Sequence, residues 1–297
     1  EFRRVLFRSE AKAFPSDQYA IQSQVKLHGF NPEEAIIEVQ PKEGTSYIEL
    51  SDILDTIKKH GEETALVLFG GVNYYSGQVF DMQTICKAAH EAGAYCGFDL
   101  AHAAGNIHLD LHDWNVDFAC WCSYKYLNAG PGAVGGAFVH DRHAMNAELP
   151  RFAGWWGNDP QTRFSMPEQF IPNKGADGWQ LSNAPVFSMA ALRASMELFD
   201  EAGMERLTAK SKQLTSFLEF IIGEINSSTE GKNHIKIITP AASRGCQLSL
   251  IIQKNGKAIH DRLLQKGVIS DWRHPDVIRV APVPMYNSFQ DVFEFGQ

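Results

Sequence analysis

The chain has 297 residues, of which 44% are hydrophobic and 21% charged, and its formal net charge is −8. These fractions are ordinary for a globular protein and allow one large core or two smaller ones. The acidic balance and the lack of a Lys/Arg run argue against nucleic acid or an anionic membrane as a partner. No apolar stretch reaches the roughly 18 residues that a membrane span needs.

The two ends of the sequence differ from its middle. Residues 1–9, EFRRVLFRS, mix basic and apolar side chains but lack the apolar core and cleavage site of a signal peptide. Their sequence also differs in character from the sequence that begins at Glu10, so we expect residues 1–9 to be foreign to the natural protein. The sequence stops at FEFGQ, within a predicted helix, and we expect truncation at both ends.

Short apolar runs alternate with helical patterns in the first half of the chain. We predict strands at 64–71, 94–99, 116–123 and 135–140 and helices at 52–61 and 80–93. Ser51 and Gly61 are the expected ends of the first helix, and Gly93 is the expected C-cap of the second. This alternation is typical of an α/β protein with a largely parallel or mixed sheet.

From about residue 185 the pattern changes to two long amphipathic helices, at 187–203 and 204–225. Further elements are expected as strands at 235–239, 246–252 and 278–282 and a helix at 257–267. We place a domain boundary within residues 195–205. It divides the chain into a large domain, 10–198, and a smaller C-terminal domain, 199–297.

Two residues at predicted strand ends could carry chemistry. Asp99 and Lys125 both follow apolar strands, and ligands of open α/β sheets lie beyond the carboxyl ends of the strands. Pyridoxal phosphate (PLP) chemistry requires such a pair: a lysine that forms a Schiff base with the cofactor, and a carboxylate that keeps the pyridine nitrogen protonated. Alone the pair is weak evidence, because a single Lys is usually solvated and a strand-end Asp often caps a helix.

The text around these residues resembles the kynureninase family of fold-type-I PLP enzymes. The resemblance rests on FPSDQYAIQSQVKLHG (14–29), DLAHAAGN (99–106), CWCSYKYLNAGPG (120–132), GWWG (154–157), LSNAPV (181–186) and IRVAPVPMYNSF (278–289). It implies an aminotransferase class V-like α/β fold, with a mostly parallel mixed sheet flanked by helices and a smaller C-terminal α+β domain. The implied reaction is hydrolysis of L-kynurenine or 3-hydroxy-L-kynurenine to anthranilate or 3-hydroxyanthranilate and L-alanine. The implied assembly is a cytoplasmic homodimer with shared active sites.

The resemblance assigns cofactor-binding residues position by position. Lys125 matches the Schiff-base lysine, Asp99 matches the partner of the pyridine nitrogen, and His102 lies near the cofactor ring. Phe14 matches the aromatic residue that stacks on the ring. The other residues of the FPSD turn, Pro15, Ser16 and Asp17, are also assigned to the cofactor site. Among them, Asp17 matches a second acid of the pocket.

Five further residues are assigned by the same resemblance. Tyr124 matches a hydroxyl near the phosphate and the reacting centre, and Arg279 matches the arginine that grips the substrate α-carboxylate. Trp155 and Asn183 match residues delivered to the site by the neighbouring subunit. Gly70 stands where the family usually has a serine near the phosphate, although backbone N–H groups could still serve there. Taken singly, Phe14 and Trp155 could be core aromatics and Arg279 a structural ion-pair partner.

Some alternatives stay open at this stage. The family's phosphate-binding loop precedes the FPSD segment and is missing from this sequence, so weak cofactor binding or an inactive fragment is one alternative. Cysteine desulfuration or transamination on the same scaffold is another. A desulfurase would need a cysteine on a mobile loop, and we expect the five cysteines to be buried free thiols instead. His108, Asp110 and His112 alternate as ligands on a strand would, but no metal motif accompanies them and we expect no metal site.

Overall fold

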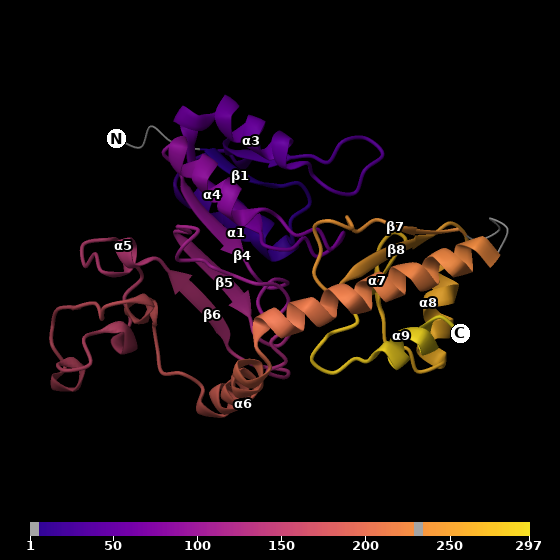
Figure 1. The fold of residues 1–297 in the computed structure, drawn as a ribbon. Coiled ribbons are helices and arrows are strands. Elements are labelled where there is room, and N and C mark those ends of the chain that lie inside the picture. Colours follow the sequence, from indigo (N-terminus) through magenta and orange to yellow (C-terminus); the bar gives the residue numbers. More distant parts are fainter. Residues whose placement is uncertain (1–5, 229–233) are drawn as a thin grey trace.

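A computed structural model describes residues 6–228 and 234–297 and contains two β-sheets (Figure 1). The larger sheet has the strand order β2-β1-β3-β4-β5-β6. Its strands are β1 (Leu6–Glu10), β2 (Ile36–Val39), β3 (Thr64–Gly70), β4 (Tyr95–Asp99), β5 (Phe118–Cys122) and β6 (Gly135–Val139). Neighbouring strands run parallel except β5 and β6, which are antiparallel. The sheet is therefore the mostly parallel, mixed sheet that the sequence predicts.

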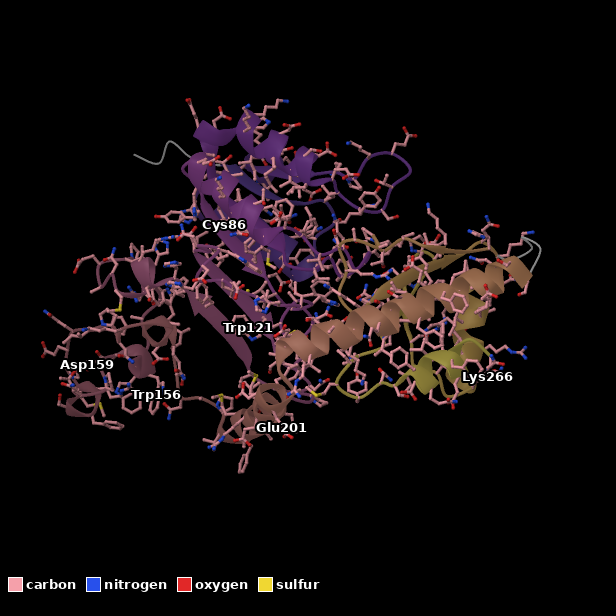
Figure 2. All side chains as sticks on the ribbon, viewed as in Figure 1. Cys86, Trp121, Trp156, Asp159, Glu201 and Lys266 are labelled. Carbon is pink, nitrogen blue, oxygen red and sulfur yellow. The ribbon has the colours of Figure 1, made fainter. Side chains whose placement is uncertain are left out.

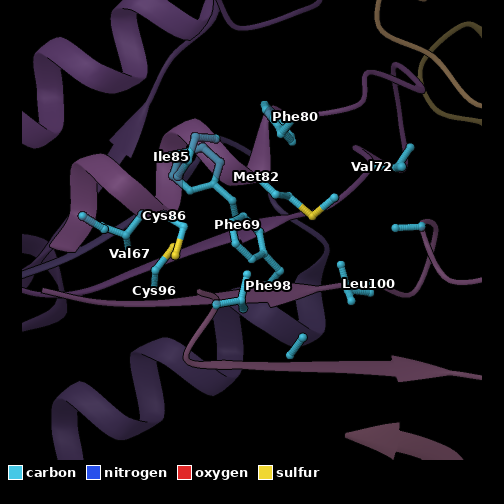
Figure 3. Close-up of a cluster of buried hydrophobic side chains, with 14 of the residues drawn as sticks. Val67, Phe69, Val72, Phe80, Met82, Ile85, Cys86, Cys96, Phe98 and Leu100 are labelled. Atoms are coloured by element: carbon cyan, nitrogen blue, oxygen red, sulfur yellow. The ribbon is translucent and has the colours of Figure 1, made fainter. Parts of the chain in front are cut away.

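Helices flank this sheet and bury its apolar side chains. They are α1 (Pro15–Leu27), α2 (Pro32–Ala35), α3 (Leu50–Lys59) and α4 (Met82–Glu91). Figure 3 shows Phe69 of β3, Phe98 of β4 and Ile85 of α4 in one cluster, and all three are at most 1% exposed. Each such side chain stabilises the fold by about 2–3 kcal/mol relative to an exposed one. This core fixes the positions of β3 and β4, whose carboxyl ends reach the site described below.

The C-terminal part packs one long helix on an antiparallel sheet. Two helices lead into it, α6 (Val186–Ala202) and α7 (Met204–Ser228). The sheet has the order β7-β8-β10-β9. Its elements are β7 (Ile235–Ile237), β8 (Leu248–Ile252), α8 (Gly256–Gln265), β9 (Asp271–Arg273), β10 (Val277–Val280) and α9 (Phe289–Phe295). Leu214 and Leu218 of α7 form a core with Leu248 and Ile278, separate from the core of the larger sheet.

The segment between β6 and α6 extends away from both sheets (Figure 1). It contains α5 (Asp141–Ala144) and three short 3₁₀ helices, at Trp155–Gly157, Arg163–Ser165 and Ala176–Trp179. Figure 2 labels Trp156 and Asp159 in this segment and Trp121 on the larger sheet. Its α5 end is joined to the larger domain by Arg142 and His143, which both pair with Asp117, whereas large apolar side chains farther along the segment are exposed.

Several local predictions require correction. Helix α3 begins after Glu49 and ends before His60, so Ser51 is not its N-cap and Gly61 lies beyond it. The C-cap of α4 is Ala92, and Gly93 follows it. These shifts of one or two residues arise because cap geometry depends on backbone angles that composition does not specify.

Further observations concern the N-terminus and the polar clusters. Residues 6–9 form β1 together with Glu10 and pair with β2 and β3, while residues 1–5 lie outside the described residues. The expectation that residues 1–9 are foreign to the natural protein stays a prediction. His108 and Asp110 lie in an irregular segment rather than on a strand. In the described part of the chain, no group of three or more His, Cys, Asp or Glu side chains has an arrangement that could hold a metal ion. All five cysteines are free, but only Cys86, Cys96 and Cys246 are buried; Cys120 is exposed and Cys122 is half-buried.

No helix within residues 6–228 and 234–297 combines the length and apolar character needed to cross a membrane. The structure therefore offers no helical span among its described residues.

Candidate active site

A pocket lies at the carboxyl edge of the larger sheet, where parallel strands end together. Glu10, Gly70 and Asp99 are the last residues of β1, β3 and β4, and all three line the pocket. The turn after β5 contributes Tyr124 and Lys125. The cavity volume is about 160 Å³. The sheet order thus gathers residues from positions 10 to 125 that the sequence keeps far apart.

The turn that carries Lys125 is held by its neighbours. Ser123 is fully buried and its hydroxyl donates to the Val134 carbonyl at 2.5 Å. The Ala129 N–H donates to the Ser123 carbonyl at 3.0 Å, which closes the turn. Lys125 Nζ then lies 5.6 Å from the centre of the Phe14 ring. Lysine and aromatic ring therefore face the same space, as stacking on a ring cofactor requires.

The pocket also gathers carboxyl groups. The Ala101 N–H donates to Asp99 Oδ1 at 2.8 Å, so Asp99 is oriented by the loop that follows β4. Asp17, in the first turn of α1, has its pKa raised to about 8, first by burial and then by the charge of Asp99, against the opposing effect of Lys125. Burial is also the main reason that the pKa of Glu10 is raised to about 7. Such a cluster favours a cation in the pocket.

His102 follows Asp99 into the same pocket. Burial, followed by the positive charges of Lys125 and Arg279, lowers the pKa of His102 to about 3, so the imidazole is neutral at physiological pH. Its Nδ1 atom is buried, and no partner for it occurs in the described part of the chain. The ring meets Tyr126 edge-on, with 5.8 Å between the ring centres. An unsatisfied buried nitrogen beside the pocket is consistent with a bound group that completes its environment.

A wider cleft, of about 680 Å³, adjoins the pocket and shares with it Phe14, Tyr74, His102, Tyr124 and Lys125. The smaller sheet contributes Arg279 and Asp271 to the cleft. Arg279 Nη1 donates to the carbonyl of Tyr74 at 2.6 Å, which links the smaller sheet to the pocket. Clefts of this size accept small organic ligands, and a guanidinium at the wall suits a carboxylate.

Tyr124 is 53% exposed and lines both the pocket and the cleft. Its pKa is raised, first by a hydrogen bond with Cys122 and by the charge on that thiol. The hydroxyl is therefore protonated at neutral pH and able to donate.

Four predicted residues have surroundings that differ from the rest. Pro15, Trp155 and Asn183 line neither the pocket nor the cleft. Trp155 Nε1 donates to the Arg163 carbonyl at 3.1 Å, and Asn183 is exposed. Gly70 does line the pocket, but its N–H is engaged by both carboxyl oxygens of Glu10 at 3.1 Å and is not free to bind a phosphate.

Glu10 and Asp271 are among the site residues that sequence reasoning missed. Glu10 ends β1, but its strand was obscured because residues 1–9 were interpreted as foreign. Asp271 lines the cleft beside Arg279. The only sequence signal for Asp271 is that it lies in a short strand two residues before Arg273. Such an acid is too common to identify a site.

The donor set fits PLP. An amine, a half-buried acid pair, an aromatic face and a neutral imidazole surround one cavity, and an arginine lines the adjoining cleft. Lys125 would hold the cofactor covalently, Asp99 and Asp17 would hold the ring nitrogen, and Phe14 would cover the ring.

Comparison with known families matches two overlapping parts of the chain. Residues 30–240 match the family described as Aminotransferase class-V, and residues 207–297 match the Kynureninase C-terminal domain. PLP is the cofactor of the class-V group. The first match alone covers more than half of the chain.

Solved structures share the fold at low sequence identity. A cystine C-S lyase in complex with cysteine persulfide has a TM-score of 0.81 and 17% identity, over 99% of this chain and 74% of that chain. A cysteine desulfurase from Thermococcus onnurineus NA1 has a TM-score of 0.77 and 15% identity, over 99% of this chain and 72% of that chain. A variant of the lyase carries glycine covalently linked to its PLP cofactor (TM-score 0.80, 16% identity, 99% of this chain and 75% of that chain). These likenesses establish a fold-type-I architecture.

Sequence relatives are much closer. A kynureninase from Flavobacterium psychrophilum is 57% identical over 97% of this chain and 68% of its own length. The kynureninase of Myxococcus xanthus is 56% identical over 96% of this chain and 66% of its own length. That of Nematostella vectensis is 52% identical over 96% of this chain and 63% of its own length. The chain thus spans about two thirds of the length of these relatives, and it belongs to the kynureninase family.

Proposed function

We propose that this chain uses PLP to hydrolyse L-kynurenine or 3-hydroxy-L-kynurenine to anthranilate or 3-hydroxyanthranilate and L-alanine. It would thus be a hydrolase of carbon–carbon bonds in ketonic substances. The observation that carries the proposal is that Asp99, Lys125 and Arg279 line one continuous pocket and cleft. Asp99 and Lys125 line one pocket, and Arg279 lines a cleft that also includes Lys125.

Each residue has a defined task in this reaction. Bound PLP supplies an electron sink for the negative charge that forms at the substrate α-carbon. Asp99 would keep the proton on the ring nitrogen, and Asp17, whose pKa is raised to about 8, would stand beside it as a second acid. Lys125 Nζ would remove the α-proton of the bound substrate.

The later steps involve groups of the cleft. The Arg279 guanidinium binds the α-carboxylate and so fixes the substrate while bonds change. One water molecule adds to the γ-carbonyl and the Cβ–Cγ bond breaks, with the carbonyl carbon leaving as the anthranilate carboxylate and the remainder as alanine. The Tyr124 hydroxyl, which is protonated at neutral pH, would supply or return protons in these steps.

We also propose that the active unit is a homodimer in which Trp155 and Asn183 reach the site of the other subunit. Neither residue lines the pocket of its own chain. The segment between β6 and α6, with the start of α6, exposes large apolar side chains, including Phe152 at 80%, Val186 at 75% and Phe187 at 93%. Such a surface is typical of a covered interface. The proposed setting is the cytoplasm, in tryptophan catabolism toward NAD biosynthesis.

The central experiment combines cofactor labelling with a turnover assay. Purified chain is incubated with PLP, scanned for a near-visible absorbance band, reduced with borohydride and digested for peptide mapping. Label on Lys125 together with anthranilate release from kynurenine supports the proposal. Label without anthranilate, but with sulfide release from cysteine or keto acid from an amino donor, supports a desulfurase or transaminase instead. Absence of both band and label indicates an inactive fragment.

A mixing experiment addresses the shared site. Lys125→Ala and Asn183→Ala are each expected to be inactive because each lacks one part of every site. Mixed dimers would contain one intact site, so activity should return to at most about a quarter of that of the wild type, by random pairing. Lack of recovery, with dimers present by sedimentation, would contradict sharing.

A further inference from the structure

Glu10 is a buried carboxyl group for which the proposed reaction has no use. It is the last residue of β1, is 3% exposed and lines the pocket that also contains Asp99 and Lys125. No ion pair of the described residues includes it. An ionised carboxylate removed from water without a cation is costly, and proteins keep such groups mainly where function needs them.

The hydrogen bonds of Glu10 tie it to the neighbouring strand. The Gly70 N–H donates to Oε1 and to Oε2, both at 3.1 Å. The Ser9 hydroxyl donates to Oε2 at 3.4 Å. These are neutral donors, so they orient the carboxyl group without compensating its full charge.

The strand order connects Glu10 to Asp99. Strand β3 lies between β1 and β4, and its last residue, Gly70, is the register partner of Asp99. The next N–H, of Gly71, donates to the Asp99 carbonyl at 2.7 Å. A Cβ atom on residue 70 would lie 3.0 Å from Glu10 Oε1, so the glycine leaves room for the carboxyl group to reach across β3. The sheet edge is therefore shaped around three neighbouring strand ends.

We propose that Glu10 is a third acid of the cofactor site, a positioning residue that fixes the end of β3 and adds negative charge behind Asp99 when a protonated ring nitrogen occupies the pocket. The inference rests on the proposed function, since the cation in question is the pyridinium of PLP. It assigns Glu10 no direct contact with substrate.

The raised pKa of Glu10 predicts the direction of a measurable change, the release of a proton when PLP binds. Burial, with a smaller contribution from the charge of Asp99, raises the pKa of Glu10 from 4.5 to about 7. A cation in the pocket favours the ionised carboxyl group, so cofactor binding should release a proton from Glu10 near pH 7. The gain in affinity that Glu10 provides should therefore grow as pH rises from 6 to 8.

The proposal and a purely structural role predict opposite effects of removing the Glu10 charge on thermal stability. The pKa of Glu10 is raised in the folded chain, so its ionisation cost is fully present above about pH 7 and absent below pH 4.5. Glu10→Gln keeps an oxygen that accepts from Gly70 but removes the ionisable group. It should raise the melting temperature of the cofactor-free chain at pH 8, and this gain should shrink toward pH 5. If Glu10 merely holds strands together, the variant should melt lower at both pH values.

The binding measurement uses PLP itself as the probe. We expect Glu10→Gln to weaken PLP affinity about tenfold at pH 8 and less at pH 6, as one charge at short range implies. Calorimetry in two buffers with different ionisation heats should show fewer protons released by the variant than by the wild type. Glu38→Gln, an exposed position on β2 beside β1, is the matched control and should change none of these readouts.

The outcomes separate the two claims. Equal PLP affinity and equal proton release in wild type and Glu10→Gln would overturn the role of Glu10 while leaving the cofactor site intact. Failure of the wild-type chain to bind PLP at all would overturn the proposed function, and the role of Glu10 with it. A lower melting temperature of Glu10→Gln than of the wild type at both pH 5 and pH 8 would also reject the proposal, because it would show that Glu10 mainly holds the strands together.

Discussion

Arg279 Nε donates to Asp271 Oδ2 at 2.6 Å, and the same oxygen accepts a second hydrogen bond from Arg273 Nε at 2.8 Å. Arg279 and Asp271 are register partners on β10 and β9. A carboxylate of the protein thus already occupies the Nε side of the guanidinium that is proposed to bind the carboxylate of the substrate. The two carboxylates compete for one cation unless the substrate uses the opposite edge.

Asp271→Asn is expected to lower KM for kynurenine about three- to tenfold with little change in kcat, because removal of the competing charge is worth about 1 kcal/mol at a half-exposed site. Steady-state kinetics checks this. Asp261→Asn, an exposed acid paired with Lys257 on α8, is the matched control. A rise in KM would mean that Asp271 orients Arg279 rather than competing for it.

Arg279→Lys is expected to raise KM about 100-fold, since lysine keeps the charge but cannot donate two parallel hydrogen bonds to a carboxylate. PLP affinity, measured by absorbance titration, should stay near that of the wild type because Arg279 lines the cleft and not the pocket. Loss of PLP binding together with substrate binding would contradict this separation.

Phe14→Leu is expected to weaken PLP binding about five- to tenfold, the equivalent of an aromatic stacking contact of about 1 kcal/mol. Phe30→Leu provides a control of the same exposure, 37% for each residue, outside the pocket. Fluorescence titration with PLP measures both. Equal effects of the two substitutions would show that Phe14 acts only through general packing.

Asp117→Asn is expected to destabilise the chain by about 2–4 kcal/mol, because it removes the charge at the centre of a buried network. Asp117 accepts hydrogen bonds from His90 Nε2 at 2.8 Å and from the Cys96 N–H at 2.6 Å, and it pairs with Arg142. Urea unfolding measures the change. Asp110→Asn, in an exposed pair with His108, should cost far less.

The same network predicts acid sensitivity of the wild type. Burial acts to raise the pKa of Asp117, but hydrogen bonds from His143, His90 and Arg142 outweigh it and lower the pKa below 3.8. The stabilisation is therefore present above pH 3.8 and is lost as pH falls through the lower pKa of the folded state. Urea midpoints should fall more steeply below pH 4 in the wild type than in Asp117→Asn. Parallel curves would refute the assignment.

The sequence by itself determined the approximate positions of the main strands and which residues are candidates for the cofactor site. Local periodicity located β3, β4 and β5 to within about two residues, because a buried strand and a helix have different repeats of apolar side chains. Motif resemblance identified Lys125, Asp99 and Asp17 as candidates, since reactive residue types stand in a fixed order along the chain. These features are encoded by neighbours in the sequence, so no tertiary contact was needed to find them.

Only the tertiary structure decided which of these residues share one environment. The order β1-β3-β4 places Glu10 beside Gly70 and Asp99, although 60 residues separate Glu10 from Gly70 in the chain. The raised pKa values of Glu10 and Asp17 follow from burial, and the pairing of Arg279 with Asp271 follows from strand register. Burial and register are properties of packing between distant segments, and composition and periodicity do not specify them.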